Sequence, residues 1–136
     1  MEVRLLMRNP IRPKLLLQLE GLAALLVGLV LYRELGASWW WFVVLVLAPD
    51  LAFLGYVVHK RVGVMAYNVA HTYLGPAVLF TAGFLTARST MMAVGLIWAI
   101  HIGVDRLLGF GLKYEDAPFR QTHLQSADSR LPTAEG

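Results

Sequence analysis

The sequence predicts an all-α membrane protein, a four-helix transmembrane bundle with its N- and C-termini in the cytoplasm. Of the 136 residues, 57% are hydrophobic and 15% are charged, against roughly 45–50% and about 25% in an average soluble domain. The apolar residues fall into four runs, each long enough to cross a bilayer as a helix. Lysine and arginine concentrate in alternate connections between these runs. The length fits one domain and excludes a multi-domain enzyme.

The first half of the chain is predicted to contain a basic arm and two spans. Residues 1–14 are basic and interrupted by two prolines, which indicates a juxtamembrane arm. The first span covers about residues 15–32 and contains Glu20. Three consecutive tryptophans then open a second span at about residues 39–58, as is typical of a membrane interface. Asp50 follows a proline near the middle of this second span.

The second half is predicted to contain two further spans and a tail. The third span covers about residues 62–85 and contains Asn68 and His71, with a glycine–proline pair that predicts a kink one turn later. Residues 113–136 are polar and are predicted to form a cytoplasmic tail. The fourth span covers about residues 91–112 and carries three polar residues, His101, Asp105 and Arg106.

The distribution of lysine and arginine predicts the orientation in the membrane. Four of these residues lie in the arm, two in the turn at 59–61 and three in the tail, whereas the other two connections hold only Arg33 and Arg88. Because cytoplasmic loops carry the excess of basic residues, both termini and the 59–61 turn are placed in the cytoplasm. We therefore expect a multi-pass membrane protein.

Polar residues inside the predicted spans share one depth. Counting about 1.5 Å of rise per residue from the cytoplasmic ends, six of them lie roughly 8–16 Å inside the bilayer: Glu20, Asp50, Asn68, His71, His101 and Asp105. Ionisable groups at such a depth turn toward the interior of the bundle rather than toward lipid. His101 and Asp105, four residues apart, project from one face of their helix. The pattern predicts one polar site in the cytoplasmic half of the bundle.

The chemistry of this layer favours a divalent metal ion. With neutral histidines, its three carboxylates and one arginine leave a formal charge of −2, which is costly to bury without a cation. Imidazole and carboxylate ligands without cysteine suit zinc, iron(II) or manganese. Asp50, His71, His101 and Asp105 are the predicted metal ligands. Glu20 is the predicted general base for a bound water, and Arg106 the predicted partner of an anionic group.

Two other interpretations of the same residues stay open. Buried polar side chains also serve as a structural or proton-conducting network between membrane helices. His71 and His101, at similar depths on consecutive helices, also have the arrangement needed for a single bis-histidine haem. His123 is either a late ligand or head-group contact at the mouth of the bundle, or part of an amphipathic segment at the membrane surface.

Five stretches of the chain resemble a known family. LEGLAALLVGLVLY, WWWFVVLVLAPDLAFLGY, GVMAYNVAHTYLGP, LIWAIHIGVDRLLGFGLKY and FRQTHL are similar to the small bacterial membrane family catalogued as domain of unknown function 4260. The resemblance covers about residues 15–124. It implies a compact four-helix integral membrane domain whose marked polar positions in this sequence are Glu20, Asp50, Asn68, His71, His101, Asp105 and His123.

The expected function is metal-dependent hydrolysis of an amphiphilic or lipid-linked substrate at a site open to the cytoplasmic leaflet. The alternatives are a proton- or cation-coupled transport module and a purely structural membrane partner. Membrane lipids are the expected partners, with a homo-oligomer left open. Nucleic acid is excluded, because most basic residues occupy positions typical of cytoplasmic membrane anchors.

Overall fold

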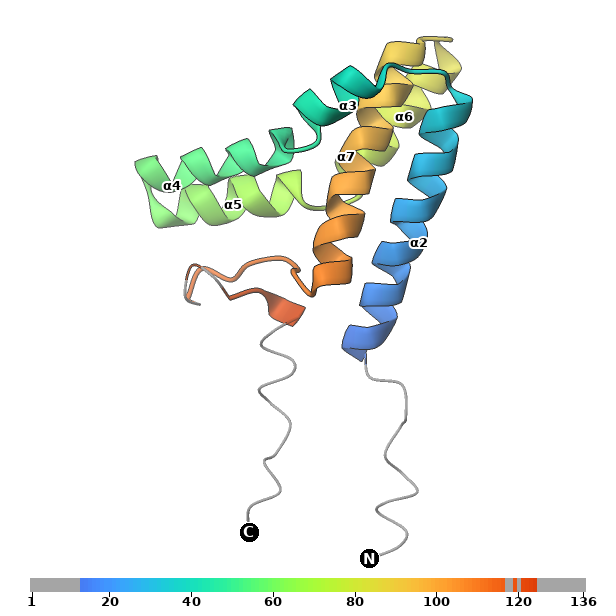
Figure 1. The fold of residues 1–136 in the computed structure, drawn as a ribbon. Helices are drawn as coiled ribbons and strands as arrows, with labels where there is room; N and C mark the ends of the chain where they lie inside the picture. Colours follow the sequence, from blue (N-terminus) through green and yellow to red (C-terminus); the bar gives the residue numbers. More distant parts are fainter. Residues whose placement is uncertain (1–12, 117–118, 120, 125–136) are drawn as a thin grey trace, which may run out of the picture.

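The computed structural model describes residues 13–116, 119 and 121–124, and this part of the chain is helical without any strand (Figure 1). Three segments are long and apolar enough to cross a membrane, Pro13–Glu34, Trp39–Val58 and Ser89–Leu108, which supports a membrane protein. Most of the predicted basic arm and the end of the predicted tail lie outside the described residues. In chain order the helices are α2 (Pro13–Glu34), α3 (Trp39–Leu45), the 3-10 helix η1 (Ala48–Leu54), α4 (Gly55–Val58), α5 (Lys60–Ala70), α6 (Leu74–Leu85) and α7 (Ser89–Leu108).

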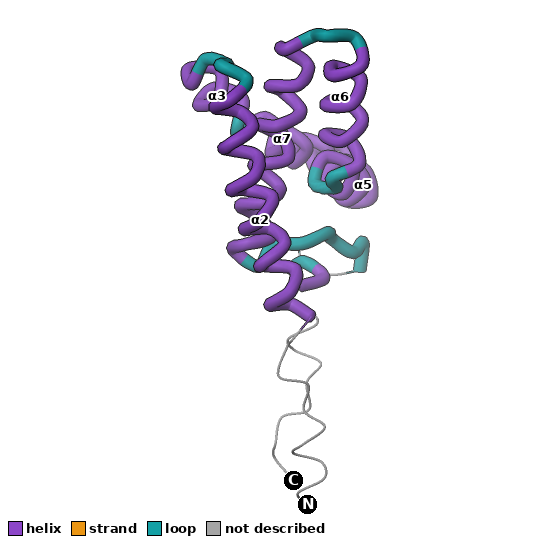
Figure 2. Tube along the Cα trace, turned by 90° about the vertical axis from the view of Figure 1, so that its right-hand side faces the viewer, coloured by secondary structure: helices purple, strands orange, loops and turns teal. Residues whose placement is uncertain are grey.

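Helix α7 is the centre of the fold. It packs against α2 on one side and α6 on the other, and the three helices run lengthwise beside one another (Figure 2). Gly21 and Gly103 allow the backbones of α2 and α7 to touch, because a Cβ atom added to Gly21 would lie 2.7 Å from the carbonyl oxygen of Gly103. The buried core beside this contact is apolar and consists of Tyr32, Ala93, Leu96, Ile97 and Ile100.

The predicted second span is an interrupted helix. Ser38 caps α3 by accepting a hydrogen bond from the backbone N–H of Trp40 (3.3 Å), and the three tryptophans are exposed, as expected of side chains at a membrane interface. The α-helix ends at Leu45, and Pro49 lies in the first turn of η1. Proline fits the first turn of a helix but not its interior. The tighter 3-10 helix η1 therefore begins at the turn that contains Pro49, and Asp50 lies in this helix.

The predicted third span is two helices rather than one. Helix α5 ends at Ala70, and α6 begins at Leu74. Pro76, two residues into α6, cannot lie inside a continuous helix, because its ring would clash with the carbonyl group of Thr72. Helices α4 and α5 form a hairpin that runs transverse to α2 and α7 and projects from the side of α7 away from α2 (Figure 1). The described chain is therefore three lengthwise helices with a transverse hairpin, and not a simple bundle of four spans.

The described chain begins and ends on the same side of the fold (Figure 1). Gly109 caps the C-terminal end of α7, and its φ of +90° is the left-handed conformation that suits glycine. The following residues return beneath the α4–α5 hairpin, where Asn68 holds them with two hydrogen bonds to the backbone of Lys113, at 2.7 and 2.8 Å. The location of the termini in the cytoplasm stays a prediction.

Candidate metal centre

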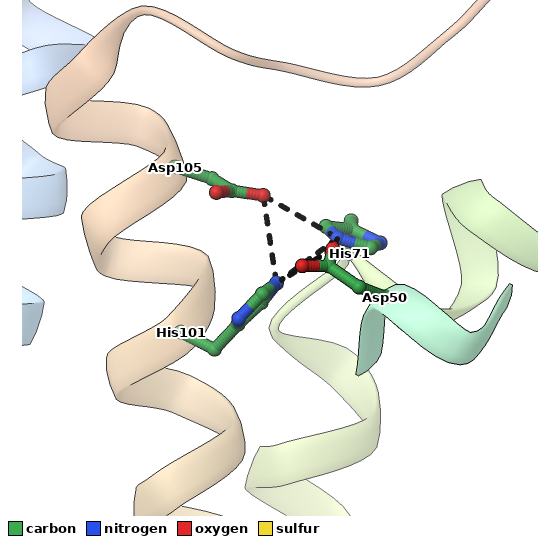
Figure 3. A group of neighbouring side chains, drawn as sticks. All are labelled: Asp50, His71, His101 and Asp105. Carbon is green, nitrogen blue, oxygen red and sulfur yellow. Dashed lines mark hydrogen bonds and ion pairs between the residues drawn. The ribbon is translucent and has the colours of Figure 1, made fainter. Parts of the chain in front are cut away.

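Four side chains from three parts of the fold meet at one point. Asp50 comes from η1, His71 from the end of α5, and His101 and Asp105 from successive turns of α7. One nitrogen or oxygen atom from each residue lies within 4.8 Å of the other three. Figure 3 shows the side chains directed toward each other. The structure therefore brings together all four residues predicted as metal ligands.

Five of the six distances among the four residues are close to those between the ligands of a tetrahedral metal ion, and the two carboxylate oxygens lie within 4.8 Å of each other. The Nε2 atom of His71 lies 3.3 Å from an oxygen of Asp50 and 3.3 Å from an oxygen of Asp105. The Nε2 atom of His101 lies 3.4 and 3.6 Å from the same two oxygens, and 3.2 Å from the Nε2 atom of His71. Ligands about 2.0–2.1 Å from a tetrahedral zinc ion lie roughly 3.3–3.4 Å from each other.

The break after α5 orients His71 toward this point. His71 follows the last residue of α5, with φ of −109° and ψ of 20°. Its Nδ1 atom lies 2.9 Å from the carbonyl oxygen of Tyr67, which can only accept a hydrogen bond. Nδ1 is therefore the donor, and the neutral ring presents an unprotonated Nε2 atom to the site. Metal-binding histidines are commonly fixed in this way by a hydrogen bond from their other nitrogen.

The four side chains differ in burial, and they carry a net negative charge when both imidazoles are neutral. The side chains of His71 and His101 are almost fully buried, whereas 40% of Asp50 and 21% of Asp105 remain exposed. With neutral imidazoles the four residues carry two negative charges, and a divalent cation would neutralise both. Two cationic histidines would also neutralise them, but two like charges would then lie 3.2 Å apart.

The structure gives Arg106 a different position from the predicted one. Its guanidinium donates hydrogen bonds to the carbonyl oxygens of His71 and Phe110, both at 3.0 Å. Arg106 therefore contacts the backbone behind a predicted ligand and does not line the cavity beside the site. It ties the end of α5 to α7.

Arg106→Gln is expected to weaken metal binding without abolishing it. Loss of the bond to the carbonyl group of His71 releases the backbone that orients this ligand, and loss of such outer contacts typically costs about 10–100-fold in affinity. A competition titration with a coloured chelator measures the change. Arg33→Gln removes an exposed arginine from α2 and provides the control. Equal affinities for the two variants would contradict the positioning role.

Two other residues of the predicted layer, Glu20 and Asn68, lie outside the cluster, and so does His123. Glu20 is on the exposed surface of α2 and does not belong to the four-residue group. Asn68 instead holds the segment after α7. His123 accepts a hydrogen bond from the backbone N–H of Leu112 (2.7 Å) through Nδ1, and burial lowers the pKa of this imidazole. The roles of Glu20 as a base and of His123 as a ligand have no support in these contacts.

Lys113, which was predicted only to be part of the polar tail, has a specific environment. Its side chain is buried, and its ammonium donates a hydrogen bond to the carbonyl oxygen of Phe119 (2.6 Å). The ammonium also faces the rings of Phe119, Phe53, Tyr67 and Tyr56, with centroids 4.1, 4.6, 4.6 and 5.5 Å away. Burial lowers the pKa of Lys113. These four rings form an aromatic box around the Lys113 ammonium. The sequence signal for the box was the i, i+3 spacing of the aromatic residues at 53 and 56.

Two cavities adjoin the four-residue group. The first has a volume of about 340 Å³ and extends from the carboxylates to the buried lysine, lined by Asp50, Phe53, Tyr67, Asp105, Phe110, Lys113, Phe119 and Thr122. The second has a volume of about 310 Å³ and is apolar. Its lining includes the residues that directly precede Asp50 and His71, and consists of Leu45, Ala48, Pro49, Ala52, Ala70, Val94, Ile97 and Trp98. The group is thus accessible from a partly charged cavity and flanked by an apolar one.

Comparison with known proteins gives one family match. A family model described as "Domain of unknown function (DUF4260)" matches residues 14–127. This range contains all four members of the group and Lys113. No curated protein and no solved structure matches the chain.

Proposed function

The chain belongs to the family described as domain of unknown function DUF4260, and from the geometry of its buried site we propose that it binds one divalent metal ion and uses it to hydrolyse a membrane-associated amphiphile. The membership confirms the resemblance seen in the sequence. The family description carries no activity, so the proposal depends on the site alone.

The mutual distances of the four predicted ligands carry the proposal. Two imidazole nitrogens and two carboxylate oxygens lie 3.2–3.6 Å apart in five pairings. These contacts come from residues up to 51 positions apart in the chain, and two of the side chains are almost completely buried. Nitrogen and oxygen ligands without sulfur suit zinc, iron(II) or manganese. A haem fits less well, because both Nε2 atoms also contact the two carboxylates and are only 3.2 Å apart.

The exposure of the carboxylates supports a reactive site over a closed structural one. A closed structural zinc site has four protein ligands, whereas a catalytic site keeps a position for water or substrate, so with all four residues bound to the ion the substrate would take a fifth position. Asp50 is 40% exposed and lines the first cavity together with Asp105, so a bound ion would be reached from that side. A divalent ion supplies Lewis-acid chemistry that activates water and polarises an ester. The protein's own residues hold the ion and shape the cavity.

The second cavity supports an amphiphilic substrate. It is lined by apolar side chains and reaches Pro49 and Ala70, which directly precede the ligands Asp50 and His71. Trp98 closes one wall and is fixed by a hydrogen bond from its Nε1 atom to the carbonyl oxygen of Ala70 (2.6 Å). An alkyl or acyl chain in this cavity would place its polar end beside the four-residue group.

The proposal is tested with protein purified in dodecyl maltoside. Hydrolysis of dodecyl p-nitrophenyl phosphate and p-nitrophenyl dodecanoate is followed by colour in metal-loaded protein and in protein stripped by a chelator. We expect release of p-nitrophenol from at least one ester, its loss on stripping, and its return with zinc or manganese. Asp105→Asn should remove the activity, and Asp116→Asn, at an exposed position beyond α7, should retain it. Hydrolysis that ignores the metal, or no hydrolysis of either ester, would contradict the proposal.

Proton- or cation-coupled transport, the alternative from the sequence, is distinguished by the same preparation. The protein is reconstituted in liposomes that contain a pH-sensitive dye. If it is a hydrolase, we expect no flux that depends on Asp50. A flux lost in Asp50→Asn, together with no esterase activity, would assign the buried group to transport.

A further inference from the structure

The buried ammonium of Lys113 has no carboxylate partner among the described residues. Its hydrogen bond goes to a backbone carbonyl, and its other neighbours are aromatic rings. Only 7% of the residue is exposed. A buried lysine without a counter-charge is costly, and ring faces and one carbonyl compensate only part of that cost. The position would be stabilised by an anion.

The cavity beside Lys113 has room for such an anion and connects it to the proposed metal site. It has a volume of about 340 Å³ and is lined by Lys113 as well as by Asp50 and Asp105. The hydroxyl-bearing Thr122 also lines it, and the rest of the wall is aromatic. If Asp50 and Asp105 hold a divalent ion, an anion in this cavity would have two cationic neighbours, the ion and the Lys113 ammonium. Without the ion, the same carboxylates would repel an anion.

We propose that this cavity is a phosphate-binding subsite, in which Lys113 and the ion held by Asp50 and Asp105 bind a phosphate group from opposite sides. The inference rests on the proposed metal site and names the substrate class, a phosphate ester. A lysine ammonium is a common partner of phosphate oxygens, and binding between two cations selects an oxyanion over a cationic or neutral head group. The phosphate belongs either to a lipid or to a water-soluble ester, and the two sources differ in their need for the apolar cavity.

Binding of two phosphate probes to the manganese-loaded protein tests the subsite. Manganese(II) is paramagnetic, so a phosphate bound near it shows a strongly enhanced ³¹P relaxation rate. We expect a saturable enhancement with both inorganic phosphate and dodecyl phosphate. Tighter binding of dodecyl phosphate would identify a lipid-borne group, and equal binding a soluble ester. In Lys113→Gln the phosphate affinity should fall by at least about tenfold, the loss expected for one charge-assisted contact, while the manganese content stays unchanged.

Lys60→Gln is the matched control, because Lys60 is exposed at the start of α5. Lys113→Arg, which keeps the charge, should bind phosphate more tightly than Lys113→Gln and serves as the second variant if the glutamine variant does not fold. Equal phosphate affinities for Lys113→Gln and Lys60→Gln, or no saturable effect in the wild-type protein, would overturn the subsite.

The metal content separates this inference from the proposed function. Protein that binds manganese but not phosphate retains the metal site and loses the subsite. Protein that binds no metal contradicts the proposed function and, with it, binding of phosphate between two cations. Calorimetry with inorganic phosphate on the metal-free protein then shows whether Lys113 binds an anion by itself: binding lost in Lys113→Gln would retain an anion site, and absence of binding would overturn it.

Discussion

His101→Ala is expected to reduce the bound metal from one ion per chain to a trace. The Nε2 atom of His101 lies within 3.6 Å of one ligand atom from each of the other three residues, so its removal opens one corner of the proposed coordination shell. Loss of a direct ligand should cost more than the about 10–100-fold that follows loss of an outer contact. Elemental analysis of protein purified without added chelator measures the metal content.

His59→Ala is the matched control for this variant. His59 is exposed and caps the start of α5 by accepting a hydrogen bond from the backbone N–H of Arg61 (3.1 Å). Its loss should cost about 1 kcal/mol of helix stability and leave the metal content unchanged. If His101→Ala retains a full equivalent of metal while His59→Ala behaves like the wild-type protein, the ion is bound elsewhere.

Gly21→Leu is expected to separate α2 from α7. A Cβ atom at this position would lie 2.5 Å from the Cβ atom of Arg106 and 2.7 Å from the carbonyl oxygen of Gly103. Because the second contact is with backbone, the neighbour cannot move aside by changing rotamer, and the helices must shift. Overpacking of this kind typically costs about 1–3 kcal/mol and occasionally more. We expect the upper part of this range, measured as the free energy of unfolding in mixed detergent micelles.

Ala23→Leu places the same side chain two residues away on the exposed face of α2. Its free energy of unfolding should stay within about 0.5 kcal/mol of the wild-type value, as is usual for surface positions. A Gly21→Leu variant as stable as Ala23→Leu would show that α2 and α7 are not in close backbone contact. Metal content in Gly21→Leu should also fall if the packing of α7 helps to hold His101 and Asp105 in place.

The four ligands could be predicted because their depth and spacing depend on local helix geometry. His101 and Asp105 are four residues apart and lie on one long helix, so a straight-helix count places both correctly. The same count assigned Glu20 and Asn68 to this layer. Depth along a helix does not fix the direction of a side chain around its axis, and these two residues face other surroundings.

The break at His71 and the box around Lys113 could not be predicted in the same way. The apolar run from 62 to 85 was predicted as one span with a kink at its glycine–proline pair, whereas the structure divides it into two helices between Ala70 and Leu74. Lys113 meets rings from η1, α4 and α5 only because the chain turns back after Gly109. Such contacts depend on tertiary packing, which the polar composition of the tail does not reveal.

X-ray absorption spectroscopy of the purified, metal-loaded protein is the most direct test of the metal centre. The four-residue site predicts a first shell of nitrogen and oxygen at about 2.0–2.2 Å with scattering from two imidazole rings and no sulfur, and loss of one imidazole contribution in His71→Ala. A bound metal whose shell contains no imidazole, or a folded protein that binds no divalent metal at all, would contradict it.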